Sequence, residues 1–333
     1  MNNIYFGIDT SNYRTSAALI DSEGLVLDQK AVLLDVPEGK RGLRQSEAFF
    51  MHSNRLPGYI EKLFGAVDPS CIQAVGVSER PRRVEGSYMP CFLAGVNAAR
   101  EIASALRIPV YGFSHQEGHA AAVMECEGNA PSPCTLFFHL SGGTTEALLC
   151  RPDEKGYSME IVGGTRDISV GQLLDRFGVA SGFPFPSGKM LDDIAYEALE
   201  KNAFIMRKDE RTGVIPKIRS DEGYFNLSGA ETRLMRYAAE HKGEPVVRIA
   251  ADLFSSISEL LLNTAQYLSE RYCTSDIYMA GGVASSRTFR AIASKSNTLE
   301  IKFGTPGLSG DNAVGTALLA KRIHETGNSN SGK

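Results

Sequence analysis

Two histidines four residues apart, His115 and His119, are the residues of this sequence best suited to chemistry. Imidazole nitrogens bind divalent metals well, and residues four apart on a helix lie on the same face. A helix N-terminus also disfavours imidazolium, which keeps both rings in the neutral form that a metal requires. Two histidines do not complete a metal site, and the alternative is a helix start with two exposed histidines.

The residues around this pair predict the helix that positions it. Residues 108–112 form a short apolar run that ends on a glycine, which is typical of a strand. Ser114 can cap the following helix, and Glu117 lies three residues later, at the spacing of a capping box. The alanine-rich run 120–124 then continues the helix.

Composition limits the class of protein. A chain of 333 residues is long enough for two domains with separate cores. No apolar run approaches the roughly 18 residues of a membrane span, and the first residues lack the pattern of a secretory signal. The six cysteines form no C-x-x-C pair, as expected of thiols in a reducing cytosol. We therefore expect a cytoplasmic protein that does not enter the membrane.

Net charge gives a further constraint. The formal charge is −4, so a nucleic-acid partner would need a local basic patch. The turn at residues 78–84 carries Arg80, Arg82 and Arg83 and is one such candidate. A solvated loop is the ordinary interpretation of this cluster, and contact with an anion or with RNA is the alternative.

A strand, a hydroxyl-rich turn and a second strand occur twice along the chain. The first copy covers residues 4–20 and the second covers residues 136–149. A third glycine turn, at Gly281 and Gly282, joins a strand to a helix. Backbone amides in such turns can face a phosphate, although an ordinary hairpin needs no ligand.

The placement of these turns predicts an α/β protein with two duplicated lobes around a central cleft. Actin-like and sugar-kinase-like ATP-binding proteins are built in this way. A proline-containing break at 129–133 separates the halves. We predict a first lobe at 1–128 joined by a C-terminal helix at 311–325, a second lobe at 129–310, and a disordered tail at 326–333.

Eight short motifs follow one another along nearly the whole chain. They are Asp9-Thr-Ser, His115-x-x-x-His119, Ser141-Gly-Gly, Gly171 with Asp175, Pro186-Ser-Gly188, Phe225-x-x-Ser228-Gly229, Gly281-Gly-Val-Ala284 and Asp311-Asn312. Each motif is short, but the ordered set is specific. In this order they resemble the universal tRNA threonylcarbamoyladenosine transferase family, once called O-sialoglycoprotein endopeptidases.

The resemblance implies the actin-like ATPase fold and one divalent metal ion, iron or zinc, between the lobes. Its ligands would be His115, His119 and Asp311, although Asp311 could also cap the last helix. Family members transfer the threonylcarbamoyl group from threonylcarbamoyl-AMP to N6 of the adenosine beside the tRNA anticodon. The implied partners are tRNA, other subunits of the complex that forms threonylcarbamoyladenosine, and a second chain docked on the first lobe as a homo- or heterodimer.

The resemblance also assigns roles to individual residues. Asp9 and Ser141 would be catalytic, and the Ser141 turn with the metal would hold the phosphate and threonylcarbamoyl ends of an adenylate. Asp175 would contact the ribose. The full set expected to bind adenylate or ATP is Ser141, Gly142, Gly143, Asp175, Gly188, Gly281, Gly282 and Ser286.

Several positions depart from the family pattern, and they cluster where the chemistry would occur. Tyr13 and Arg14 replace an acidic pair, Thr144 replaces a histidine, Ser286 an asparagine and Glu231 a lysine. These changes suggest a diverged paralogue with a more anionic ligand or an altered catalytic arrangement. Two alternatives follow: a carbamoyl-type transferase acting on another acceptor, and a non-catalytic partner subunit that binds nucleotide and metal. Proteolysis has no support, because the histidines do not form His-Glu-x-x-His.

Overall fold

The computed structural model describes residues 3–11, 13–35, 43–126, 132–202, 204, 206–296, 298–305, 307–308 and 313–331. The chain divides into two compact units. Unit 1 comprises Met1–Pro133, Arg151–Met159 and Thr305–Lys333, and unit 2 comprises Cys134–Cys150 and Glu160–Gly304. The predicted lobes differ from these units chiefly at residues 151–159, a hairpin turn that belongs to unit 1.

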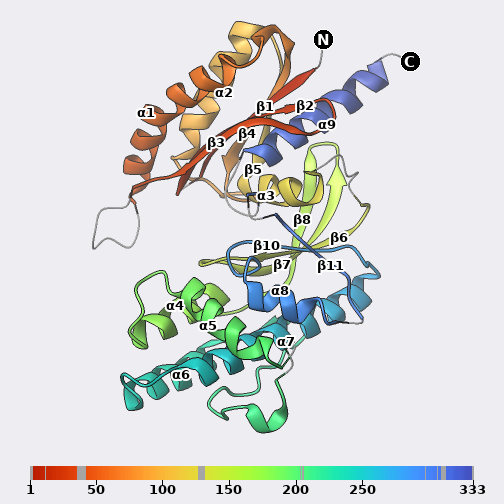
Figure 1. Ribbon diagram of the computed structural model, residues 1–333. Helices are drawn as coiled ribbons and strands as arrows, with labels where there is room; N and C mark the ends of the chain where they lie inside the picture. Colours follow the sequence, from red (N-terminus) through yellow and green to blue (C-terminus); the bar gives the residue numbers. More distant parts are fainter. Residues whose placement is uncertain are drawn as a thin grey trace. The chain divides into compact units, whose positions relative to one another are not determined.

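Unit 1 is built on a sheet with the strand order β3-β2-β1-β4-β5 (Figure 1). β1 pairs antiparallel with β2 and parallel with β4, and β4 pairs parallel with β5. The elements are β1 (Ile4–Ser11), β2 (Arg14–Asp21), β3 (Val26–Leu33), α1 (Gln45–Phe64), β4 (Ile72–Arg80), α2 (Phe92–Leu106), β5 (Val110–Ser114), α3 (His115–Met124) and α9 (Val314–Ser331).

Alternate side chains of β1 belong to two different cores, because successive residues of a strand point to opposite faces. Phe6 and Ile8 pack in a cluster with residues of α1 and α2, whereas Tyr5 packs in a cluster with residues of α9. Glycines let α9 lie directly against the sheet. A Cβ at Gly7 would lie 2.1 Å from the Ala313 carbonyl oxygen, so this position requires glycine.

Unit 2 contains the sheet order β11-β10-β6-β7-β8-β9. β6 pairs antiparallel with β7 and parallel with β10. The elements are β6 (Thr135–Leu140), β7 (Thr145–Asp153), β8 (Gly156–Thr165), α4 (Val170–Ala180), α5 (Gly188–Glu200), β9 (Tyr224–Phe225), α6 (Ser228–Glu240), α7 (Val247–Tyr272), β10 (Ile277–Ala280), α8 (Arg287–Ala293) and β11 (Ile301–Phe303).

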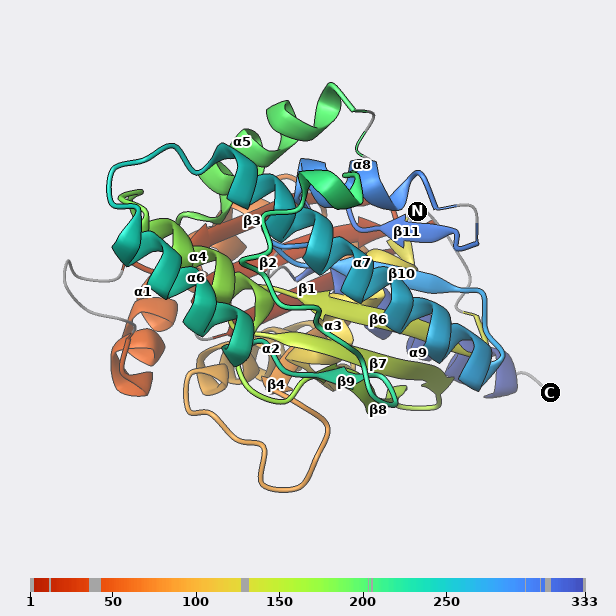
Figure 2. The ribbon, with the colours of Figure 1, turned by 90° about the horizontal axis from the view of Figure 1, so that it is seen from below.

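The long helix α7 supplies much of the unit 2 core. Leu253, Ile257 and Leu261 are buried along it and pack with side chains of the sheet. Figure 2 shows α7 and α6 lying across one face of this unit. The strand–turn–strand copies predicted at residues 4–20 and 136–149 are the hairpins β1–β2 and β6–β7, so the prediction of a duplicated α/β chain is confirmed.

The C-terminal segment differs from its prediction. The tail expected from residue 326 is helical as far as Ser331, because α9 continues beyond the expected end. None of the helices in the described ranges is long and apolar enough to cross a membrane.

Candidate functional site

The histidine pair lies at the start of α3, in unit 1. The predicted capping box is present: the Glu117 carboxylate accepts the Ser114 amide at 2.8 Å, and the Ser114 hydroxyl accepts the Glu117 amide at 3.2 Å. These bonds fix the first turn, so His115 and His119 project from one face. Their Nε2 atoms are 3.0 Å apart.

Asp9 holds the first histidine in place. Its Oδ2 lies 2.7 Å from His115 Nδ1 and accepts the Ser78 hydroxyl at 2.5 Å, and its Oδ1 accepts the Ser11 amide at 2.9 Å. Asp9 is almost fully buried, with 1% of its surface exposed. A carboxylate on Nδ1 leaves Nε2 as the ligating nitrogen, as is common at metal-bound histidines. The contact of Asp9 with His115 and the role of Ser78 were not foreseen from the sequence.

The Nε2 atoms of His115 and His119 could supply two ligands of a metal site. Metal–imidazole bonds are about 2.0–2.1 Å long, so both Nε2 atoms can reach one ion. Asp311, the third ligand implied by the resemblance, lies outside the described residues. Within those residues, no group of three or more His, Cys, Asp or Glu side chains is placed to hold a metal ion. The described structure therefore supplies two ligands with a supporting carboxylate.

The arginine turn has a structural role in unit 1. Arg83 donates to both Asp153 carboxylate oxygens, at 2.9 and 3.1 Å, and to the Tyr157 carbonyl oxygen at 3.0 Å. It also lies 3.4 Å from Glu117, whose carboxylate is buried. Arg83 therefore ties the hairpin turn at 151–159 to the helix that carries the histidines.

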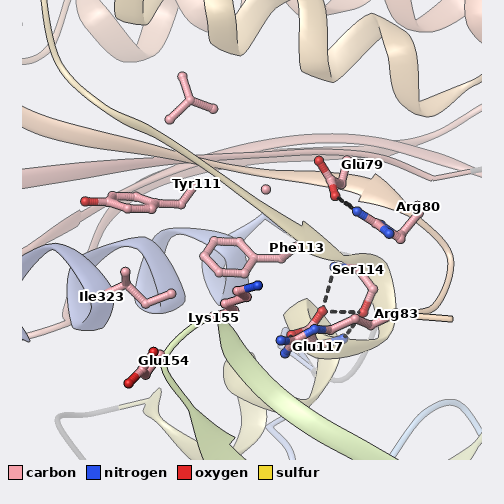
Figure 3. A pocket seen from close by; sticks show the side chains of 12 residues that line it. Glu79, Arg80, Arg83, Tyr111, Phe113, Ser114, Glu117, Glu154, Lys155 and Ile323 are labelled. Carbon is pink, nitrogen blue, oxygen red and sulfur yellow. Dashed lines mark hydrogen bonds and ion pairs between the residues drawn. The ribbon is translucent and has the colours of Figure 1, made fainter. Parts of the chain in front are cut away.

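Arg80 is also paired, because it forms an ion pair with its neighbour Glu79. Figure 3 shows both arginines at the rim of a pocket of about 410 Å³ beside β5. The acidic residues Glu79, Glu117 and Glu154 line the same pocket. Since carboxylates balance its cations, this pocket lacks the excess of positive charge that an anion site needs.

Cys91, near Asp9, is a poor nucleophile. Burial, followed by the nearby charge of Asp9, raises the pKa of its thiol to about 12. A thiol with this pKa is protonated at neutral pH, so it supplies no thiolate for covalent catalysis.

In unit 2 the candidate site is made of backbone. Residues 141–144 form a tight turn in which the Ser141 amide donates to the Thr144 carbonyl oxygen at 2.8 Å. The Ser141 hydroxyl accepts the Thr144 amide at 3.0 Å. No atom lies within 4 Å of a Cβ built at Gly142 or Gly143, so these residues border open space. Such a turn leaves room for a ligand to approach the main chain.

Two more segments close around this turn. A Cβ at Gly171, in the first turn of α4, would lie 2.5 Å from the Gly142 Cα. Gly281 has a φ of +103°, and its Cβ would lie 2.3 Å from the Leu140 carbonyl oxygen. The predicted glycines Gly142 and Gly281 therefore lie close to the first turn of α4. That helix start is already capped, because the Val170 amide donates to the Thr145 hydroxyl at 2.9 Å and the Gln172 amide to the Ser169 hydroxyl at 3.1 Å. The open space at Gly142 and Gly143 is therefore the part of this place that can receive a ligand.

The predicted ribose contact, Asp175, has partners within the protein. Its Oδ1 accepts the backbone amides of Ser187 at 2.8 Å and Gly188 at 3.0 Å, where α5 begins. The structure therefore brings together the predicted nucleotide residues Asp175 and Gly188. The carboxylate satisfies amides at the helix start, which is the function of a cap.

Comparison with known proteins identifies the family. Residues 36–318 match the model of the tRNA N6-adenosine threonylcarbamoyltransferases. The chain belongs to this threonylcarbamoyltransferase family. Its relatives of that name include proteins from Thermus thermophilus, 29% identical over 96% of this chain and 93% of the relative, and Bacillus licheniformis, 28% identical over 96% and 92%.

Solved structures show the fold that this threonylcarbamoyltransferase-family chain shares. Component A of the (R)-2-hydroxyglutaryl-CoA dehydratase of Acidaminococcus fermentans aligns with a TM-score of 0.56 and 14% identity, over 97% of this chain and 99% of that one. Full-length HypF, in a phosphate- and nucleotide-bound form, aligns with a TM-score of 0.60 and 12% identity, over 96% and 46%. The predicted actin-like ATPase fold is thereby confirmed.

Two departures from the threonylcarbamoyltransferase pattern have local explanations. The Ser286 hydroxyl donates to Asp192 at 2.6 Å and accepts the Phe289 amide at 3.0 Å, so it caps α8. Glu231, at the family lysine, forms an ion pair with Arg176 at 2.7 Å. Both side chains therefore have partners inside unit 2, and Asp192 was not foreseen because it lies 94 residues from Ser286 along the chain.

Proposed function

We propose that this protein transfers the threonylcarbamoyl group from threonylcarbamoyl-AMP to N6 of the adenosine next to the tRNA anticodon, in a metal-dependent reaction. Family membership over residues 36–318 supports the reaction class. The observation that carries the proposal is the histidine pair: His115 and His119 present their Nε2 atoms 3.0 Å apart, with Asp9 on His115 Nδ1.

In unit 1, His115 and His119 would hold the metal, with Asp311 as the third ligand implied by the resemblance. The bound metal, iron or zinc, would supply Lewis-acid polarisation of a carbonyl and stabilisation of a leaving phosphate. The hydrogen bond between Asp9 and His115 Nδ1 keeps a proton on that nitrogen and the lone pair on Nε2.

In unit 2, the open turn at Gly142 and Gly143 would bind the adenylate through backbone amides. The bond between N6 and the carbamoyl carbon forms as the bond from that carbon to the phosphate oxygen breaks. AMP and one proton from N6 are released. A tRNA acceptor implies action in the cytoplasm, together with other subunits of the modifying complex docked on unit 1.

One observation favours a second candidate, a partner subunit that binds nucleotide and metal without catalysis. The side chains of Asp175 and Ser286, both assigned to the nucleotide, are engaged in capping α5 and α8. A subunit that binds nucleotide only through its backbone would keep the glycine turns and lose side-chain contacts. A carbamoyl-type transferase acting on another acceptor remains the third candidate.

The test is single-turnover transfer with purified protein, threonylcarbamoyl-AMP and an unmodified tRNA transcript. Threonylcarbamoyladenosine is measured by mass spectrometry of the digested RNA, and metal content is measured on the same preparation. We expect about one metal ion per chain and formation of the modified nucleoside. The double variant His115→Ala/His119→Ala should lose both, while His241→Ala, which changes a histidine of unit 2, should lose neither.

The outcomes separate the candidates. Metal and adenylate binding with no product, even when partner subunits are added, would support the binding subunit. Transfer to a small amine acceptor but not to tRNA would support another carbamoyl-type transferase. Product formation by the metal-free double variant would contradict the metal-dependent mechanism.

A further inference from the structure

A hollow with an excess of positive charge lies in unit 2, outside the residues assigned to the nucleotide. It has a volume of about 280 Å³ and lies between the loop at 216–221 and the start of α6. Arg166, Lys217 and Arg219 line it, together with one acidic residue, Asp221. The excess of cations distinguishes it from the charge-balanced pocket beside β5.

The cations of this hollow also differ from many others in unit 2. Several arginines elsewhere in unit 2 form ion pairs with carboxylates; the pairs are Arg176–Glu231, Arg211–Asp252, Arg236–Glu240 and Arg287–Asp193. Within the described ranges, no carboxylate forms an ion pair with Arg166, Lys217 or Arg219. Their charges are therefore available to a ligand, because no internal salt bridge must first be broken.

An aromatic ring orients one of these cations. The Arg166 guanidinium lies over the Tyr224 ring, 5.0 Å from its centroid. The ring is fixed in turn, since the Tyr224 hydroxyl donates to the Ile161 carbonyl oxygen at 3.1 Å. The Arg166 amide donates to the Phe225 carbonyl oxygen at 2.9 Å. A guanidinium held by stacking is already ordered for bidentate contact with a phosphate.

The start of α6 does not itself provide the charge for this hollow. Asp167 already accepts the amides of Leu227 and Ser228 there, at 2.9 Å each. The helix instead extends the row of cations. Arg233 is exposed and follows Gly229, which lines the hollow, by four residues, so both lie on one face of α6.

We propose that Arg166, Lys217, Arg219 and Arg233 form a contact surface for the phosphate backbone of an RNA. This inference rests on the proposed function, for which the RNA is the tRNA acceptor. Clustered arginine and lysine at the protein surface are the footprint of a nucleic-acid surface. The whole chain carries a charge of −4, so attraction of a polyanion depends on such a local cluster.

The test measures binding of an unmodified tRNA transcript by the full-length protein across a range of salt concentrations. Lys217→Ala/Arg219→Ala removes two cations of the surface. Lys295→Ala/Arg271→Ala removes two exposed cations of unit 2 that do not line the hollow. All four side chains are at the protein surface, so both variants should fold.

For the first variant we expect a dissociation constant raised roughly tenfold at physiological salt, and a salt slope reduced by about 2, one for each lost phosphate contact. The control should match wild type in both quantities. Binding of a stable adenylate analogue should be unchanged in both variants, because none of these residues belongs to the glycine turns.

The possible failures are distinguishable. Equal weakening of tRNA binding in both double variants would mean that the overall electrostatic field of the protein attracts the RNA. That result would overturn the proposed surface. Wild-type binding that neither variant changes would overturn the surface but leave the tRNA acceptor intact. Absence of tRNA binding by wild type, alone or with partner subunits, would contradict the proposed acceptor itself. Competition by polyglutamate as strong as by polyuridylate would assign the surface to an acidic protein partner.

Discussion

The two units share a topology but build their candidate sites from different materials. Each unit begins with an antiparallel hairpin, β1–β2 in unit 1 and β6–β7 in unit 2. In unit 1 the site is made of side chains: Asp9, in β1, contacts His115, which faces His119. In unit 2 the site is made of main chain: the Ser141 turn, which joins β6 to β7, is enclosed by Gly171 and Gly281.

Departures from the family pattern occur in both units. Tyr13 and Arg14 depart in unit 1, at the start of β2. Ser286 and Glu231 depart in unit 2, and both have partners within that unit. A site made of backbone requires space and allowed dihedral angles, so the side chains around it can change.

The largest expected effect comes from filling the space around the backbone site. Gly281→Ala places a methyl group 2.3 Å from the Leu140 carbonyl oxygen at a φ of +103°. Strain of about 1–3 kcal/mol adds to the steric clash, so we expect a total loss of at least about 3 kcal/mol. A loss of this size lowers Tm by at least about 6 °C, which thermal unfolding measures.

A matched change separates folding from ligand binding. A Cβ at Gly142 meets nothing within 4 Å, so Gly142→Ala should leave Tm unchanged. The same variant should weaken binding of the adenylate analogue in calorimetry, because the methyl group enters the space left for the ligand. A Gly142→Ala protein that binds the analogue as well as wild type would show that the ligand does not approach this turn.

The second effect concerns the side-chain site of unit 1. Asp9→Asn preserves the shape of the residue but removes its charge from His115 Nδ1. We expect metal affinity to fall by about 10–100-fold, as is usual when a carboxylate partner of a ligating histidine is lost. Competition with a chelator measures this affinity. The metal affinity of His119→Ala should fall further, since this change removes a ligand. Equal metal affinity of Asp9→Asn and wild type would contradict the positioning role of Asp9.

The contrast between the units also explains what the sequence could reveal. The Ser114–Glu117 capping box, the facing histidines and the glycine turns depend on residues within a few positions of one another, so local spacing predicts them. The contacts of Asp9 with His115 and of Asp192 with Ser286 join residues 106 and 94 positions apart. Such contacts form only when the sheet and the helices pack together, so the spacing of nearby residues does not predict them.

The arginine turn illustrates the same limit. Its composition is compatible with a solvated loop and with an anion site, and charge alone does not separate these interpretations. The deciding residues are Asp153 and Tyr157, which reach Arg83 from a hairpin 70 and 74 positions away. Lys217 and Arg219, which we propose as contacts for RNA phosphates, lie in a polar loop that carries no recognisable sequence motif.

The third prediction compares two arginines of that turn. Arg83→Ala removes bonds to Asp153 and Tyr157 and a cation beside the buried Glu117. Because the Arg83 side chain is one-third exposed, we expect a loss of only about 1–2 kcal/mol. Arg80→Ala removes one ion pair with its neighbour and should change stability by at most about 0.5 kcal/mol. Chemical denaturation measures both.

The same two variants test whether RNA binding belongs to unit 2. Neither should alter the salt slope of tRNA binding, because both arginines are already paired with carboxylates in unit 1. A slope reduced by about 1 in Arg80→Ala would place a phosphate contact on the arginine turn instead.

The smallest expected effect is a pH dependence from unit 1. His52 is fully buried in α1, and its Nδ1 lies 2.8 Å from the Thr15 hydroxyl. Burial lowers the pKa of His52 below its usual 6.5. Between the folded pKa and 6.5, the unfolded chain binds more protons than the folded one. The stability associated with neutral His52 is therefore complete above pH 6.5 and declines as the pH falls below it.

Replacement by a residue that does not titrate should remove this component. Gln can retain a hydrogen bond to Thr15, so His52→Gln tests protonation with little change in packing. We expect the free energy of unfolding of wild type to fall more steeply below pH 6.5 than that of the variant, by at most about 1.4 kcal/mol per pH unit. Urea titrations at several pH values measure the difference. The two proteins differ at this one residue, so the contributions of all other groups cancel in the comparison. Parallel curves would mean that His52 does not sense pH.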